Sequence, residues 1–396
     1  MKIAILTSGI LPVPAVLGGA VENLIDFYLE YNDQHKLHDI TVYSIGNDKT
    51  KTHPALKSGV NHYYFIDTTS FIARVKRKFF SMLKKYQGPY HYSVGYYLEQ
   101  ALKHIRRQSY DLIILENRPA YALRVRQITD AKIVYHLHNE KIDYNSDWGN
   151  QIYHIASRIV TVSDYISSCI KEDLNHHKCI TVHNGIDTAA FSPSRNPVVT
   201  RKGLGFDEDD FILVFSGRFH PEKGILQLIE ALLTIQPQPK IKLLIIGSPF
   251  YGNALLKAES DFVASVKEKA SPIIESIKFT GFVPYKAIPD YLQMADVAVI
   301  PSVWDDPFPT TVLEAQAMGK PIIASRRGGI PEEVSEDNAI LIETDDYFVK
   351  HLSEAILDLY HNPEKRKKMA EASCNRARLF DKDTYSRNFF KAINSI

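Results

Sequence analysis

Short apolar runs alternate with longer segments of helical periodicity along the whole chain. The runs are rich in Val, Ile and Leu, which is typical of strands buried on both faces of a parallel sheet. The segments between them repeat apolar residues at helical spacing, as in VENLIDFYLEY after the first run. The pattern predicts an α/β fold with doubly wound parallel sheets. The predicted strands are residues 2–7, 39–45, 61–66, 111–116, 132–138, 158–163 and 179–184 in the first half, and 211–217, 242–248, 276–282, 296–302, 321–325 and 339–343 in the second.

A segment of prolines, glycines and acidic residues, DTAAFSPSRNPVVTRKGLGFDEDD, separates the two halves and places a boundary near residues 192–205. A chain of 396 residues is also longer than a single hydrophobic core usually supports. We therefore expect two Rossmann-like domains that face each other across a cleft, at residues 1–195 and 205–380. Ligands of such sheets bind beyond the carboxyl ends of the strands, so the loops after the strands are the candidate sites.

Charge and cysteine content narrow the function classes. The 47 Lys and Arg residues nearly balance the 46 Asp and Glu residues, which argues against a nucleic-acid partner. Any site that binds an anion must therefore be formed by a local group of residues rather than by the charge of the whole protein. The three cysteines show no paired or metal-ligand spacing, which favours a reducing, cytoplasmic compartment. No apolar run approaches the roughly 20 residues of a membrane span.

The loop SGRFHPEKG combines features of a phosphate site. Gly217 ends a predicted strand, Arg218 and Lys223 follow within the loop, and a helical pattern starts directly afterwards. A helix N-terminus presents free N–H groups and a positive dipole, and arginine adds a planar pair of donors, so this loop suits a phosphate group. The alternative is a solvated turn that carries two surface cations.

A second helix is expected to start near Thr310 or Thr311, with Pro309 at its entry. Glu314 then falls in the first turn, where an acid can simply stabilise the helix dipole. Its functional interpretation is a carboxylate that accepts both hydroxyl groups of a ribose.

Five motifs in order carry a family resemblance: GGAVENL, VHNGIDTAAFSP, SGRFHPEKG, PSVWDDPFPTTVLEAQAMGKPIIASRRGGIPE and LFDKDTYSRNFFKAI. Together they span nearly the whole chain, which resembles the family 4 retaining glycosyltransferases of the GT-B fold. The resemblance implies a nucleotide-sugar site in the second domain. It also implies that residues 381–396 form a helix that crosses back to the first domain.

The resemblance assigns roles by position. Arg218 and Lys223 resemble the pair that grips the donor diphosphate, and Glu314 resembles the ribose-binding acid. Asp306 stands where the family usually has Glu, and Pro309 stands where a Gly is usual, which removes one backbone N–H donor. The implied donor-binding residues are Gly217, Arg218, Lys223, Gly281, Phe282, Asp306, Phe308, Pro309, Thr310, Thr311 and Glu314.

The first domain offers acceptor-side candidates. Gly18, Gly19 and Glu22 lie between the first strand and its helix, where the family places a glycine loop beside the transferred sugar and the acceptor; a plain tight turn is the alternative. His138 resembles the histidine that touches the transferred sugar, and it joins Asp306, Arg218 and Lys223 as a catalytic candidate. His136 lies two residues earlier and is expected in the core. We expect no metal at this pair, because no cysteine or suitable carboxylate accompanies it in the sequence.

Residues 71–86 interleave cations with apolar residues and contain no acid. They predict a basic amphipathic helix, which is either a packed helix with a charged outer face or a surface for anionic lipid.

The expected function is the transfer of a hexose-type sugar from a nucleotide sugar, UDP-linked, to a sugar or lipid-linked acceptor in cell-surface polysaccharide or glycolipid synthesis. The reaction would proceed with retention, without a metal or another cofactor, in the cytoplasm or at the inner face of the membrane. A GT-B sugar-nucleotide epimerase and a non-catalytic sugar-nucleotide-binding protein are the alternatives.

Overall fold

The computed structural model describes residues 1–57, 59–83, 91–140, 142, 149–170, 176–194, 196–247 and 261–396. The chain forms two compact units: unit 1 contains Met1–His183 and Asp383–Ile396, and unit 2 contains Asn184–Lys382. The chain passes from unit 1 to unit 2 after His183. This is earlier in the sequence than the predicted boundary near residues 192–205. The reason is that the residues after His183 bond to unit 2: Asn184 Nδ2 donates to the carbonyl of Phe308 at 2.9 Å, and Ile186 N donates to that of Phe380 at 2.8 Å.

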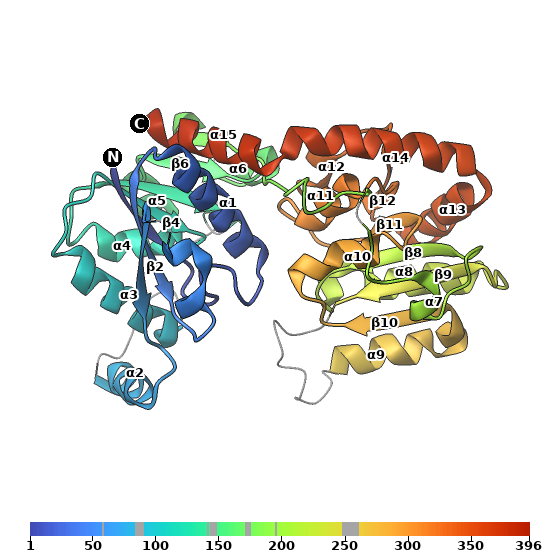
Figure 1. Ribbon diagram of the computed structural model, residues 1–396, viewed down its shortest axis with the longest axis horizontal. Helices are drawn as coiled ribbons and strands as arrows, with labels where there is room; N and C mark the ends of the chain where they lie inside the picture. Colours follow the sequence, from blue (N-terminus) through green and yellow to red (C-terminus); the bar gives the residue numbers. More distant parts are fainter. Residues whose placement is uncertain are drawn as a thin grey trace. The chain divides into compact units, whose positions relative to one another are not determined.

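Unit 1 is built on a parallel sheet, and each strand predicted for the first half is present (Figure 1). Across the described residues the strand order is β3-β2-β1-β4-β5-β6-β7. The strands are β1 (Lys2–Leu6), β2 (Asp39–Ile45), β3 (Asn61–Ile66), β4 (Leu112–Glu116), β5 (Lys132–Leu137), β6 (Arg158–Thr161) and β7 (Cys179–Thr181).

The last helix of the chain completes the core of unit 1. Tyr28 on α1 stacks on Phe389 of α15, with ring centroids 4.4 Å apart and an interplanar angle of 9°, and both rings are fully buried. Figure 1 shows α15 lying beside α1. The helices of unit 1 are α1 (Ala20–His35), α2 (Phe71–Leu83), α3 (Tyr92–Ile105), α4 (Ala122–Val125), α5 (Gly149–Ile155), α6 (Asp164–Ser168) and α15 (Lys382–Asn394).

Unit 2 repeats the architecture, and the strands predicted for the second half are all present. The order in the part of the chain that is described is β10-β9-β8-β11-β12-β13. The strands are β8 (Phe211–Ser216), β9 (Ile241–Ile246), β10 (Ile277–Gly281), β11 (Val297–Ile300), β12 (Ile322–Ser325) and β13 (Ala339–Ile342). The helices are α7 (Arg201–Leu204), α8 (Ile225–Thr234), α9 (Asp261–Ala270), α10 (Ile288–Leu292), α11 (Thr310–Ala317), α12 (Ile330–Glu333), α13 (Phe348–His361) and α14 (Pro363–Ala377).

Both sheets are doubly wound, and this order locates the candidate sites. In unit 1 the strand order reverses between β1 and β4, and in unit 2 it reverses between β8 and β11. At such a point the loops after the two strands turn to opposite faces and leave a crevice at the carboxyl edge. The expected fold of two Rossmann-like parallel-sheet units is confirmed. Among the described helices, none combines the length and the apolar character that a membrane crossing requires.

Candidate functional site

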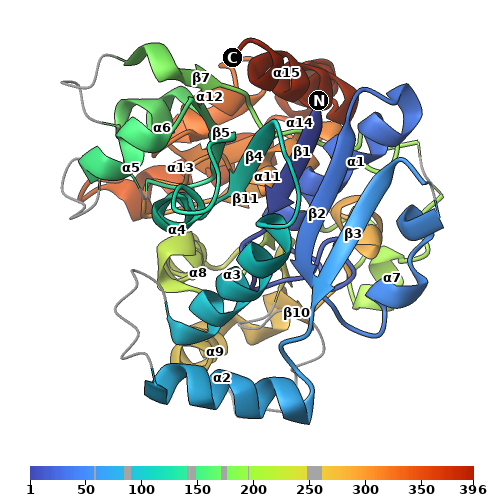
Figure 2. The ribbon, with the colours of Figure 1, turned by 90° about the vertical axis from the view of Figure 1, so that its left-hand side faces the viewer.

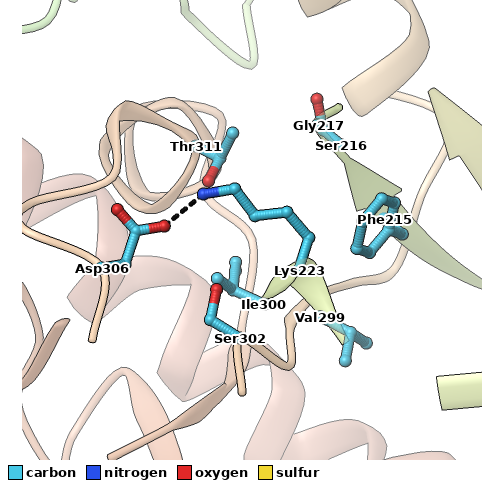
Figure 3. Close-up of a pocket in the computed structure, with 9 residues that line it drawn as sticks. All are labelled: Phe215, Ser216, Gly217, Lys223, Val299, Ile300, Ser302, Asp306 and Thr311. Carbon is cyan, nitrogen blue, oxygen red and sulfur yellow. Dashed lines mark hydrogen bonds and ion pairs between the residues drawn. The ribbon is translucent and has the colours of Figure 1, made fainter. Parts of the chain in front are cut away.

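A small pocket lies at the reversal point of the unit 2 sheet (Figure 3). Its volume is about 30 Å³, which is room for roughly two water molecules. The carboxyl ends of β8 and β11, the loops that follow them and the start of α11 form its wall. The lining residues are Phe215, Ser216, Gly217, Lys223, Val299, Ile300, Ser302, Asp306 and Thr311.

Two predicted residues meet in this pocket. The Nζ atom of Lys223 forms an ion pair and hydrogen bond with the Oδ2 atom of Asp306, and Figure 3 shows the two side chains converging beside Thr311. Asp306 is 5% exposed. The same Nζ atom lies 5.9 Å from the centre of the Trp304 ring. Because the pair is shielded from bulk water, the attraction between its charges is stronger than at an open surface.

A close contact between two loops holds Lys223 in place. Lys223 ends a short 3₁₀ turn, Pro221–Lys223, and Gly224 then caps α8 with φ 71°. A Cβ atom on Gly224 would collide with the carbonyl of Pro301, so only glycine permits this approach. Val303 N also donates to the carbonyl of Glu222 at 2.9 Å. The loop after β8 is thus fastened to the loop after β11.

The turn RRGGIPE fixes the position of Asp306. Gly329 N donates to the carbonyl of Asp306 at 2.8 Å, and Gly328 N donates to Asp305 Oδ1 at 3.2 Å. Gly328 has φ 54°, and a Cβ atom there would collide with the backbone of Asp306. This second glycine turn, which follows β12, therefore packs directly against the loop that carries the acid.

Glu314 lies deeper than the sequence suggested. The helix α11 starts at Thr310, as predicted, with Pro309 as its N-cap, but its first turn holds no acid. The prediction of Glu314 in the first turn is wrong, because the helix starts four residues before it. Glu314 is 3% exposed. Burial raises its pKa to about 8 against a smaller opposing effect of the Thr310 hydrogen bond, and its Oε2 atom has no hydrogen-bond partner among the described residues.

Sequence reasoning missed another buried acid of unit 2, Glu333. Glu333 ends α12 and is fully buried, and both of its carboxyl oxygens lack hydrogen-bond partners within the described part of the chain. Burial raises the pKa of Glu333 well above its usual value, and the charges of Asp306 and Glu332 raise it further.

Seven of the predicted donor residues do not line the pocket. Arg218 follows Gly217 and is exposed, and Gly281 ends β10 with its carbonyl accepting from Gly247 N at 3.1 Å. Phe308 is buried edge-on against Phe380, with ring centroids 5.7 Å apart. Gly217, Lys223, Asp306 and Thr311 line the pocket, whereas Arg218, Gly281, Phe282, Phe308, Pro309, Thr310 and Glu314 do not.

The predicted residues of unit 1 gather at the reversal point of its own sheet. Gly18 and Gly19 precede α1 with φ 79° and 112°. Glu22, in the first turn of α1, is 5% exposed and faces Ser8 Oγ at 3.5 Å. Burial raises the pKa of Glu22 to about 7, and the charge of Glu116 adds to the shift.

Glu116, which the sequence did not single out, links the two histidines. Its carboxylate accepts from Tyr28 Oη at 2.8 Å and lies 3.0 Å from His136 Nδ1 and 3.4 Å from His138 Nε2. His136 is fully buried, as expected. Burial and the neighbouring His136 lower the pKa of His138 to about 4, so His138 is neutral at pH 7.

The same three side chains could hold a metal, because their ligand atoms lie within 4.8 Å of one another. Their mutual hydrogen bonds already account for this spacing. A further acidic group, Asp207, Asp209 and Asp210, precedes β8 and surrounds Lys240. It lies at the amino end of the strand, away from the pocket at its carboxyl end.

Comparisons with known proteins agree with this architecture. The family model described as "Glycosyl transferases group 1" matches residues 199–376, and "Glycosyltransferase Family 4" matches residues 34–190. The chain is 30% identical over 392 residues to spore coat protein SA of Bacillus subtilis, covering 95% of this chain and 94% of that protein. It is 29% identical to the putative glycosyltransferase YtcC of the same organism, over 97% of this chain and 86% of that one.

Solved structures show the same fold. The structure of Anabaena Alr3699/HepE in complex with UDP and glucose superposes with a TM-score of 0.73 at 20% identity, over 100% of both chains. Sucrose-phosphate synthase from Thermosynechococcus elongatus superposes with a TM-score of 0.75 at 17% identity, over 100% of this chain and 98% of that one. The chain therefore belongs to the family 4 glycosyltransferases and has their GT-B fold.

Proposed function

We propose that this protein transfers a hexose-type sugar from a UDP-sugar to a sugar or lipid-linked acceptor, with retention and without a metal. The observation that carries the proposal is the Lys223–Asp306 pair in the pocket where the unit 2 sheet reverses. A lysine held at this edge by an acid, beside the start of a helix, is a charge arrangement that a diphosphate can enter by displacing the acid.

The nucleotide assignment draws on the relatives. Alr3699/HepE, which has the same fold, is described in complexes with UDP and with UDP-glucose. A relative in Corynebacterium glutamicum, 29% identical over 53% of this chain, is named as a GDP-mannose-dependent mannosyltransferase, so GDP-mannose is the donor to test against UDP-sugars. In our proposal Glu314 accepts the ribose hydroxyls, and Gly281 and Phe282 contact the base. Such hydroxyl groups would give the unpartnered Glu314 Oε2 atom its missing hydrogen bonds.

The chemistry follows from the charges. As the bond between the sugar C1 atom and the phosphate oxygen breaks, its electron pair stays on the diphosphate. Lys223, Arg218 and the N–H groups at the start of α11, around Thr311, stabilise that negative charge. Phe308, Pro309 and Thr310 complete this side of the donor site. Asp306, relieved of its pairing with Lys223, accepts hydrogen bonds from the sugar hydroxyls and stabilises the positive charge at C1.

The acceptor hydroxyl attacks C1 on the face that the diphosphate leaves. Its oxygen forms the new bond, and its proton passes to the departing phosphate oxygen, so the step needs no protein nucleophile. In our proposal neutral His138, together with Gly18, Gly19 and Glu22 of unit 1, orients the sugar and the acceptor. The acceptor class follows relatives that are named for lipopolysaccharide and phosphatidylinositol glycosylation. The place of action is the cytoplasm, at the inner face of the membrane.

Thermal unfolding measured with UDP, GDP and a panel of their sugars tests the donor. A ligand at 100 times its Kd adds about 2.7 kcal/mol of stability, so UDP and one UDP-sugar should raise the Tm by several degrees in EDTA. NMR of the donor with an oligosaccharide acceptor should then show UDP release coupled to a retained glycosidic linkage. An altered sugar formed without acceptor would indicate an epimerase, and binding without turnover on any acceptor would indicate a non-catalytic protein; either result overturns the proposal.

A further inference from the structure

The helix α2 presents its apolar side chains to solvent. Phe71, Ile72, Val75, Phe79 and Met82 are 77%, 65%, 42%, 60% and 71% exposed. A contiguous set of large apolar side chains is rarely left in water on a soluble domain and marks a surface that something covers. The described residues of unit 1 leave this set exposed.

Helical geometry places the five exposed apolar side chains on one side of α2. At about 3.6 residues per turn, these five side chains fall within an arc of roughly 100°. Ala73, which is 3% exposed, and the half-buried Phe80 lie on the opposite side of the helix. Phe80 packs edge-on against Tyr96 of α3, with ring centroids 6.0 Å apart. The helix therefore contacts its own unit along α3, and its apolar arc lies on the exposed side. Figure 2 shows α2 at the bottom of the view, below α3.

This arrangement argues against one of the two interpretations that the sequence left open, the packed helix with a charged outer face. A packed helix with a charged outer face buries its apolar stripe and exposes its cations. Here the apolar stripe is exposed as well, and the exposed cations Arg74, Lys76 and Lys78 lie on both sides of it. Lys84 and Lys85, which also belong to the basic segment, lie outside the described residues.

The charges of α2 favour one kind of partner for its exposed apolar face. The helix carries no acid between Phe71 and Leu83. Two of its arginines are tied back to the preceding loop: Arg74 Nε donates to the carbonyl of Thr69 at 3.0 Å, and Arg77 Nη1 donates to that of Thr68 at 3.4 Å. An apolar arc with cations on both flanks matches the boundary between acyl chains and anionic headgroups, where the arc enters the acyl region and the cations stay at headgroup depth.

We propose that α2 lies in the plane of an anionic lipid bilayer, with Phe71, Ile72, Val75, Phe79 and Met82 inserted below the headgroups and the flanking cations bound to lipid phosphates. The inference rests on α2 alone and does not depend on the proposed reaction. It assigns to unit 1 a membrane surface that would bring a lipid-linked acceptor close to the enzyme.

Vesicle sedimentation tests the proposal with the full-length protein. Vesicles of pure phosphatidylcholine are compared with vesicles that contain 30% phosphatidylglycerol (a chosen test composition, about a third anionic lipid). We expect binding to the anionic vesicles that weakens at least tenfold in the Phe71→Ser/Phe79→Ser variant and in the Lys76→Glu/Lys78→Glu variant. Val198→Ser and Lys350→Glu, which change exposed residues of unit 2, should bind like the wild type.

Fluorescence gives a second readout at the helix. In a Phe79→Trp variant, anionic vesicles should shift the emission to the blue, because the indole leaves water for the interface. Absence of wild-type binding, or binding that both α2 variants retain, overturns the proposal. A dimer that the Phe71→Ser/Phe79→Ser change dissociates, without vesicle binding, would also overturn it and assign the face to a second copy of the chain. The UDP thermal shift, measured on the same variants, reports separately on the proposed reaction and should not change.

Discussion

Lys223 and Asp306 form an ion pair across the pocket at the reversal point of the unit 2 sheet, between the loops that follow β8 and β11. The two residues are far apart in sequence, and each has a proposed partner in the substrate: the diphosphate for Lys223 and the sugar for Asp306. Without a donor the two side chains pair with each other, so in our proposal donor binding exchanges this ion pair for contacts with the substrate.

Replacing Lys223 with Ala should lower turnover several hundredfold. Removal of one group that stabilises developing charge in a shielded site costs about 3 to 4 kcal/mol in the transition state. Arg218→Ala should have an effect of the same order. Steady-state kinetics with the donor that the thermal screen identifies provides the measurement. Lys350→Ala, on the exposed face of α13, is the control, and unchanged turnover in both Lys223→Ala and Arg218→Ala would refute the donor site.

Replacing Asp306 with Asn should separate binding from catalysis. The change removes a negative charge beside the proposed diphosphate position and releases Lys223 from its ion pair. UDP should therefore bind more tightly, by about tenfold or about 1.4 kcal/mol, while turnover of the UDP-sugar falls because the sugar loses its carboxylate partner. Isothermal titration with UDP and kinetics on the same preparation measure both. Weaker UDP binding would contradict the partner exchange.

The raised pKa of Glu314 predicts how stability depends on pH. The folded carboxyl has a pKa of about 8, whereas the unfolded value is 4.5, so the folded state binds the extra proton between these values. The contribution of Glu314 to stability is fully present below pH 4.5 and is lost as the pH rises through about 8, by roughly 1 kcal/mol per unit.

Glu314→Gln should therefore gain stability over the wild type as the pH rises from 5 to 8, in denaturant titrations without ligand. The same variant should lose UDP affinity above pH 8, where Glu314 is a carboxylate, because an amide offers one acceptor oxygen to the two ribose hydroxyls and a carboxylate offers two. A stability difference that does not change with pH would show that Glu314 is charged in the folded protein.

His138→Ala should reduce turnover about tenfold, the loss expected for one hydrogen bond to the transferred sugar. The affinity for UDP should not change, because the proposed nucleotide site belongs to unit 2. With a pKa of about 4, His138 should cause no fall in turnover between pH 7 and pH 5. His62→Ala, an exposed histidine of unit 1, is the matched control. Loss of UDP binding in His138→Ala would contradict the assignment.

Gly224→Ala should cost more stability than Gly205→Ala. Both glycines have positive φ, 71° and 86°, but a Cβ atom on Gly205 meets open space whereas one on Gly224 meets the Pro301 carbonyl. The conformational strain of about 1 to 2 kcal/mol is shared, so the difference between the two variants measures the contact of the two pocket loops. Gly224→Ala should also weaken UDP binding, because Lys223 is displaced. Equal losses would contradict the loop contact.

The strands could be predicted because each is a short apolar run whose period and flanking residues are local properties of the chain. The Lys223 loop and the start of α11 were also visible as motifs. The burial of Glu314 could not be predicted, because the turn of the helix on which a residue lies depends on where the helix begins. Glu116 was missed because it ends an ordinary apolar strand, and its role arises from Tyr28, His136 and His138, which come from other elements.

The sequence by itself determined the alternation of strands and helices, the two halves, the family resemblance and the residue types suited to a diphosphate, because these depend on neighbours along the chain. Only the tertiary structure decided that Lys223 pairs with Asp306, that the Glu333 carboxyl is buried without a hydrogen-bond partner among the described residues and that the apolar face of α2 points outward. Each of these depends on which segments distant in sequence pack together, and a local pattern of polar and apolar residues does not specify that packing.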